Sequence, residues 1–202
     1  MKEKDLLRKA ALGCLFKGYL HNLRGPLQAL LVQTEILENK LEAGEAGGAV
    51  AEGMKRLKEQ IFKLTNLLAA AEEDMNREEI GPWPLHEILK KELTFWQAEL
   101  SFKHRVEQQM HIPEEYQVRM PYNRLRAGLC ALFYGLVFPL AERGGRLRLS
   151  AEGISEGVKV HFELEPPLAD TQSPFFSAAR EIWHPEARLE VYPERILVHF
   201  PA

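Results

Sequence analysis

His21 is the residue of this 202-residue chain best suited to chemistry, because side chains that suit a charged reaction partner surround it. An imidazole nitrogen on an exposed helix is a nucleophile that accepts a phosphoryl group. Arg24, Gly25 and Gln28 follow at helical spacing and share the face of His21. Arg24 and Lys17 would hold phosphoryl charge close to the imidazole. Gly25 would leave space above the ring for an incoming domain.

Two stretches with heptad spacing predict the helices that position this histidine. Their apolar residues recur at alternating intervals of three and four, the period of a coiled-coil seam. The seam residues are Leu20, Leu23, Leu27, Leu30, Thr34, Leu37 and Leu41, then Val50, Met54, Leu57, Ile61, Leu64, Leu68, Ala71 and Met75. Gly44, Gly47 and Gly48 predict a short turn between antiparallel helices. One apolar stripe per helix cannot close a core, so we expect a homodimer that completes a four-helix bundle.

The pattern changes at Gly81-Pro82-Trp83-Pro84, which predicts a break between a hairpin domain, 1–80, and a second domain, 81–202. Beyond it, helical and alternating patterns are mixed. Helices are expected over 85–100, 125–140 and 175–183, and strands over 105–112, 116–120, 146–151, 158–164, 189–192 and 196–200. Asn123 is the expected cap of the second helix. The fold class is α+β, a helical hairpin followed by an α/β two-layer sandwich.

Composition narrows the possible partners and compartments. The net charge of -3 and pI near 6.2 give no reason to expect nucleic acid. No uninterrupted apolar run approaches the roughly 20 residues that span a bilayer, and no secretory signal is visible. Cys14 and Cys130 lack disulfide or metal spacing, and the remaining histidines show no ligand spacing. We expect a cytoplasmic chain that binds no membrane and no metal.

The segment Tyr19-Leu20-His21-Asn22-Leu23-Arg24-Gly25-Pro26-Leu27 resembles the phospho-acceptor box of two-component histidine kinases, His-Glu/Asp-x-Arg-x-Pro-Leu. The order of elements after residue 81 resembles the catalytic ATP-binding domain that follows this box in the family. The end of the chain looks like the family's last helix and hairpin. It runs from Ala178-Ala179-Arg180-Glu181-Ile182 to Leu197-Val198-His199-Phe200-Pro201. The resemblance implies that His21 is the phospho-acceptor and that response-regulator receiver domains are the partners.

The same resemblance argues against ATP. The family's Mg-ATP-binding asparagines fall on Ala131 and Gly135, which have no side-chain oxygen for Mg²⁺. The family's Asp-x-Gly-x-Gly turn falls on residues 165–170, which contain no glycine, and its glycine-rich segment falls on residues 172–176. Prolines and phenylalanines there cannot replace the glycines that let backbone N–H groups approach phosphates. We therefore expect no cofactor on this chain and Mg²⁺ only on the partner receiver.

Asn22 stands where these kinases carry a carboxylate that acts as the base toward ATP, and an amide cannot accept that proton. Gly25 stands where hairpin phosphatases position water, a role that Asn22 or Gln28 would only partly fill. The resulting hypothesis is a dimeric histidine phosphotransferase, similar to the sporulation-initiation class, that exchanges a phosphoryl group between His21 and receiver aspartates. The first alternative is a non-catalytic pseudokinase module that binds a receiver or a kinase. The second is an ATP-dependent histidine kinase.

Overall fold

The computed structural model describes residues 3–42, 48–71 and 79–201. The chain divides into two compact units. The hairpin unit is Phe16–Glu73, and the α/β unit combines Met1–Leu15 with Asp74–Ala202. The division predicted at residue 80 stays a prediction, and the two compact units differ from it at the N-terminus. There the first turns of helix α1 belong with the α/β unit.

Two helices form the hairpin unit, α1 (Glu3–Glu42) and α2 (Gly48–Ala71). The first residues of α1 belong to the other unit. Pro26 lies inside α1 without ending it. The helices approach closely at Gly53, where an added Cβ would lie 2.5 Å from a methyl carbon of Leu37. The predicted turn residues Gly44 and Gly47, and the last seam residue Met75, lie outside the described residues.

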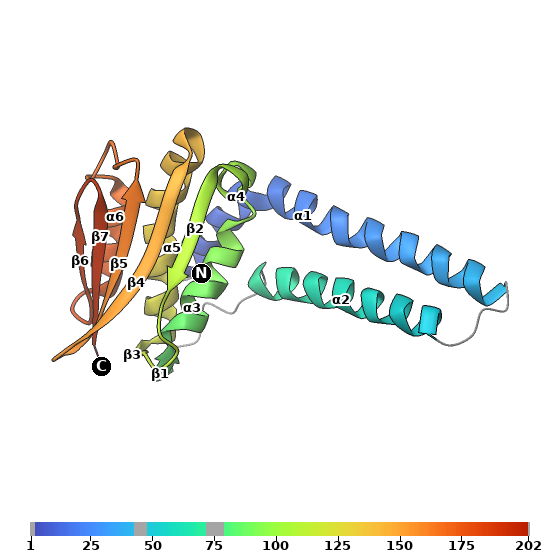
Figure 1. Ribbon diagram of the computed structural model, residues 1–202. Coiled ribbons are helices and arrows are strands. Elements are labelled where there is room, and N and C mark those ends of the chain that lie inside the picture. Colours follow the sequence, from blue (N-terminus) through green and yellow to red (C-terminus); the bar gives the residue numbers. More distant parts are fainter. Residues whose placement is uncertain (1–2, 43–47, 72–78, 202) are drawn as a thin grey trace. The chain divides into compact units, whose positions relative to one another are not determined.

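A five-stranded sheet forms one layer of the α/β unit (Figure 1). Its strands, in spatial order, are β2 (Val106–His111), β4 (Gly145–Ile154), β5 (Gly157–Glu165), β7 (Arg195–Pro201) and β6 (Arg188–Val191). β2 pairs with β4 in parallel, and the other pairs are antiparallel. All five strands fall within the predicted stretches or extend them by a few residues.

Helices form the second layer: α3 (Leu85–Trp96), α4 (Leu100–Arg105), α5 (Tyr122–Arg143) and α6 (Pro174–Trp183). Ring contacts join them to one face of the sheet. Phe133 of α5 meets Phe162 of β5 at 5.9 Å between centroids, and Trp183 of α6 meets Phe200 of β7 at 5.4 Å. The described fold is thus the predicted hairpin followed by a two-layer α/β sandwich.

Two local predictions were wrong, and one segment has a structure that the sequence did not indicate. The segment at the predicted boundary forms strand β1 (Ile80–Pro84), which pairs with β3 (Gln117–Pro121), and Trp83 Nε1 donates to the Met120 carbonyl at 2.8 Å. The single helix predicted over 85–100 is divided between α3 and α4. Asn123 does not cap α5, since the N-cap is Pro121 and Asn123 is buried within the first turn.

α5 is the central helix of the α/β unit. Among the described residues it alone is long and apolar enough to cross a membrane by length and composition, although charged residues at both ends interrupt its apolar stretch. However, 78% of its apolar window is buried in the fold. Its apolar character is therefore explained by packing in the core.

Charged residues are also buried in this core. Glu92 is fully buried and accepts from Arg8 Nη1 at 2.9 Å and from Trp96 Nε1 at 2.8 Å. Arg126 Nη2 lies 2.9 Å from the second oxygen of Glu92. The Arg8 guanidinium also lies 3.2 Å from the centre of the Phe95 ring. These contacts explain why the first turns of α1 belong to the α/β unit.

Candidate functional site

His21 lies in the part of α1 that belongs to the hairpin unit, and its side chain is exposed. The structure brings the predicted neighbours onto the same stretch of helix. Lys17, Arg24, Gly25 and Gln28 are exposed, and Asn22 is half-buried. A nucleophile, two cations and a glycine are thus open to a partner.

The residues one helical turn from His21 on α1 are positively charged or uncharged. On a helix, the neighbours of His21 are the residues three and four positions away, namely Lys17, Gly18, Arg24 and Gly25. None of these is a carboxylate. The arrangement favours a phosphoryl group on the ring, because charge-assisted bonds from Lys17 and Arg24 would stabilise it.

The backbone near His21 leaves room on the partner side. A Cβ added to Gly25 would meet no atom within 4 Å, so the glycine is not required by packing within the described hairpin. Thr34, further along α1, donates its hydroxyl to the Leu30 carbonyl at 2.9 Å. Its polar group is therefore satisfied within its own helix.

The predicted seam divides into two faces, a distinction that sequence reasoning missed. Leu23, Leu30 and Leu37 are buried or half-buried, as are Leu57 and Leu64 of α2. Six other seam residues are 47% to 63% exposed. These residues, which we call the outer apolar face, are Leu20, Leu27, Leu41, Met54, Ile61 and Leu68. A period of 3.5 residues predicts both sets together, and only the structure shows which set the hairpin buries.

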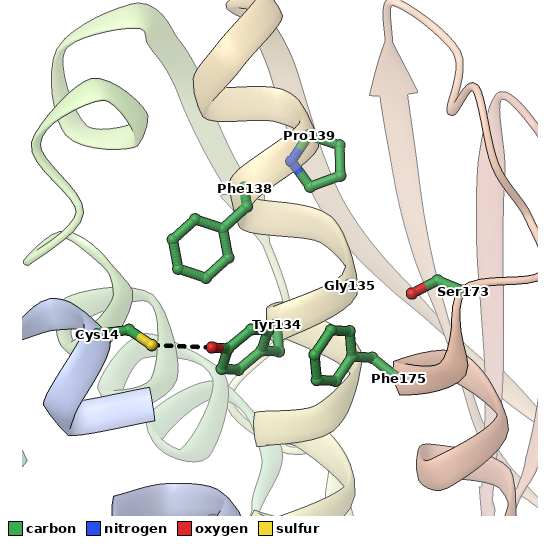
Figure 2. Close-up of a pocket in the computed structure, with 7 residues that line it drawn as sticks. All are labelled: Cys14, Tyr134, Gly135, Phe138, Pro139, Ser173 and Phe175. Carbon is green, nitrogen blue, oxygen red and sulfur yellow. Dashed lines mark hydrogen bonds between the residues drawn. The ribbon is translucent and has the colours of Figure 1, made fainter. Parts of the chain in front are cut away.

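The two positions matched to the family's asparagines have different surroundings. Ala131 is fully buried in α5. Gly135 lines a cavity of about 460 Å³ that also takes in Ser173 and Phe175, from the segment matched to the glycine-rich stretch (Figure 2). The structure thus brings the second of these positions and that segment together in the α/β unit.

The described residues include no group of three or more histidines, cysteines, aspartates and glutamates placed to hold a metal ion. Three of the remaining histidines lie on one sheet, where Ser150 of β4 pairs with His111 of β2 and with His161 of β5, and His199 of β7 pairs with Lys159 of β5. His111, His161 and His199 occupy strands, and His104 and His184 are exposed. His86 Nδ1 lies 2.9 Å from the Ile112 carbonyl oxygen.

No known family profile matches this chain, and no curated protein matches it. Solved structures do. The catalytic domain of the histidine kinase ThkA superposes with a TM-score of 0.51 at 16% identity, over 61% of this chain and 95% of the ThkA domain. The α/β sandwich has the fold of a histidine kinase catalytic domain. At this identity the likeness concerns the fold alone.

Two further structures cover more of the chain at lower similarity. The histidine kinase AdeS of Acinetobacter baumannii has a TM-score of 0.49 and 13% identity, over 90% of this chain and 97% of that chain. ThkA in complex with the response regulator TrrA has a TM-score of 0.49 and 15% identity, over 98% of this chain and 64% of that chain.

Sequence reasoning missed two groups of residues in the α/β unit. Arg8 and Glu92 are separated by 84 residues, and their types alone give no sign that they pair. Cys14 Sγ lies 2.9 Å from the Tyr134 hydroxyl at the edge of the cavity. The start of α1 packs on residues that lie up to 120 positions later in the chain, and the local spacing of apolar residues does not indicate such contacts.

Proposed function

We propose that this chain is a histidine phosphotransferase of a two-component phosphorelay, which moves a phosphoryl group between His21 and the aspartates of response-regulator receiver domains without using ATP. The observation that carries the proposal is the exposed row of His21, Lys17, Arg24, Gly25 and Gln28 on α1. The histidine-kinase-like fold of the α/β sandwich supports it, because in such kinases the hairpin with the acceptor histidine precedes this domain.

Phosphotransfer needs little from this chain beyond a positioned nucleophile. In the first step, the unprotonated ring nitrogen of His21 attacks the phosphorus of an aspartyl phosphate. The bond between phosphorus and the aspartyl oxygen breaks, and the aspartate leaves as a carboxylate. In the second step, the carboxylate of another receiver attacks the phosphohistidine, and the imidazole leaves. The receiver supplies its own Mg²⁺, while Lys17 and Arg24 stabilise charge on the transferring group.

The fold implies Mg-ATP, and the residues present do not fit it. Mg²⁺ needs oxygen ligands, and Ala131 and Gly135 offer none from their side chains. The cavity beside Gly135 has no lysine, arginine, aspartate, glutamate or asparagine among its described lining residues. A triphosphate would therefore find neither cations nor metal ligands there. This misfit supports a function that does not use ATP.

The residues beside His21 favour exchange over other reactions of such hairpins. Asn22 cannot act as the base that the attack on ATP requires. Gly25 carries no side chain that could orient water for hydrolysis of a phosphoaspartate. Reversible transfer needs neither group, so we place it ahead of kinase and phosphatase activity.

The proposed assembly is a homodimer. The outer apolar face lies on both helices of the hairpin, and contiguous apolar surface of this kind marks an interaction site. A second hairpin laid against it would form a four-helix bundle. His21 and Gln28 do not belong to this face, so they would stay open to a receiver.

The test is phosphoryl transfer to the purified chain, first with Mg-ATP alone and then with a phosphorylated receiver domain. We expect label on the wild type only with the receiver, and no label on His21→Ala. His104→Ala is the matched control, since His104 is exposed on α4 and should leave labelling unchanged. Label from ATP that depends on His21 would show a kinase. No label under either condition would favour the non-catalytic interaction module.

A further inference from the structure

The cavity of about 460 Å³ in the α/β unit has no part in the proposed phosphotransfer. α5 forms most of its wall, Cys14 from the start of α1 reaches its edge, and Ser173 and Phe175 at the start of α6 close the other side (Figure 2). This volume lies within the 300–1,000 Å³ typical of small-molecule sites.

Aromatic rings dominate the wall of the cavity. Tyr134 stacks on Phe175 with 4.2 Å between centroids and 23° between planes. Phe138 lies 5.1 Å from Tyr134. Flat aromatic faces favour a planar apolar ligand, which gains from ring stacking as well as from burial. Pro139 adds a further apolar surface.

Gly135 allows α5 and α6 to pack closely together beside the cavity. A Cβ at this position would lie 2.6 Å from the Phe176 ring, so α5 and α6 approach more closely than any other residue would permit. Gly135 therefore presents backbone to the cavity, while Phe176 fills the core behind it.

One polar group is available inside. Ser173 occupies the N-cap of α6, where a serine usually accepts from the helix backbone, yet it makes no side-chain capping bond. Its hydroxyl lines the cavity instead. The other two polar side-chain groups of the described lining residues, the Cys14 thiol and the Tyr134 hydroxyl, share a hydrogen bond with each other. No charged side chain is among the described lining residues.

We propose that this cavity binds a small uncharged molecule with a planar aromatic body and one hydrogen-bonding group, which would meet Ser173. Burial of an unpaired charge against these rings would be unfavourable, so anionic ligands, nucleotides included, do not suit the site. The proposal is independent of phosphotransfer at His21, because it rests on other residues in the other unit.

The chain carries its own reporter for this site. Cys14 is exposed at the edge of the cavity, whereas Cys130 is buried. Burial, followed by the charge of Glu92, raises the pKa of the Cys130 thiol to about 12. Since the thiolate is the reactive form, N-ethylmaleimide should modify Cys14 alone. A bound ligand would cover Cys14 and slow this modification.

The probe is N-phenyl-1-naphthylamine, an uncharged aromatic dye whose fluorescence rises in apolar surroundings. On the full chain we expect saturable binding, and Cys14 modification about tenfold slower at ten times the dissociation constant. Peptide mass spectrometry would measure the rate at Cys14 directly. Dye bound elsewhere, for example on the outer apolar face, would leave that rate unchanged and would overturn the proposal.

Two variants and one control localise the binding. Phe175→Ala removes a stacking ring, and Cys14→Asp adds a charge at an exposed position. Each should weaken dye binding at least about tenfold. Ile80→Asp removes a 66% exposed side chain that lies outside the cavity lining and should change nothing. Unchanged dye affinity in both cavity variants would refute the site. Protection of Cys14 by Mg-ATP equal to that by the dye would show a nucleotide site instead.

Discussion

The hairpin unit and the α/β unit use the same residue types in opposite ways. The hairpin exposes several leucines together with His21, Lys17 and Arg24, while the α/β unit buries its apolar residues and even encloses the Arg8–Glu92–Arg126 cluster. A surface that leaves apolar groups in water is built for contact with other chains. A core that satisfies its buried charges internally is built for stability of one chain. The difference supports the proposal that phosphoryl transfer takes place on the hairpin.

The largest effect is expected from breaking the outer apolar face. Leu27→Lys with Leu41→Lys places charges where exposed leucines of this face, 54% and 63% accessible, would meet a second copy. Since each buried leucine contributes about 1.5–3 kcal/mol, dimer affinity should fall by a thousandfold or more. Sedimentation would show a mass falling from dimer to monomer. Asn39→Lys, an exposed α1 control, should stay dimeric. A wild-type chain that is monomeric at all concentrations would contradict the bundle.

The next effect concerns the α/β unit. Glu92→Leu removes the carboxylate that pairs with Arg8 and Arg126 and accepts from Trp96. Because buried guanidinium groups would lose their counter-charge, the free energy of unfolding should fall by about 3–5 kcal/mol. Urea unfolding measures this loss. Glu87→Leu, at an exposed position of the same helix, should change it by less than about 0.5 kcal/mol. Equal effects of the two changes would show that the buried cluster is not important.

A smaller effect is expected where the fold departs from a kinase. Gly135→Asn introduces the amide expected at a Mg-ATP site, but its Cβ would lie 2.6 Å from the Phe176 ring. Overpacking of this kind destabilises by about 1–3 kcal/mol. Calorimetry with Mg-ATP should still show no binding. If this single change created nucleotide binding, the close packing of Phe176 in α6 against Gly135 would not be what prevents ATP from binding.

The smallest effect lies on the exposed face of the sheet. Hydrogen bonds from Arg146 and then Gln109 lower the pKa of Glu107 below its model-compound value of 4.5. A carboxyl with a lowered pKa stabilises the fold above pH 4.5, and this contribution is lost as the pH falls through the lowered pKa. Arg146→Gln should therefore reduce the urea midpoint slightly at pH 7, and this deficit should shrink as the pH falls below 4.5 and through the lowered pKa of Glu107. Arg188→Gln, also exposed, is the control. A deficit that does not shrink on acidification below pH 4.5 would exclude this cause.

Much of the fold follows from periodic patterns in the sequence. Alternation of apolar and polar residues predicts β4 and β5, where Leu147 and Leu149 face the helices and Arg146 and Arg148 face out. Gly144 and Gly145 mark the end of α5 because both have positive φ, and a Cβ at Gly145 would collide with the Glu165 carbonyl. Such local rules need no knowledge of distant partners.

The errors and omissions concern contacts between distant residues. β1 contains two prolines and a glycine and reads as a break, yet a bond from Trp83 to Met120 and pairing with β3 make it a strand. The sequence predicts His21 and its neighbours, because they lie on one helix. The aromatic cavity could not be predicted, since it joins residue 14 to residues 134–139 and 173–175.

The most direct test of the central claim is to locate the phosphoryl group on the chain. The wild type would be mixed with a phosphorylated receiver in the absence of ATP and analysed by tandem mass spectrometry under conditions that preserve phosphohistidine. The account predicts phosphate on His21, and its disappearance when a second, unphosphorylated receiver is added. Phosphate on another residue, or none on His21 while the receiver stays bound, would contradict it.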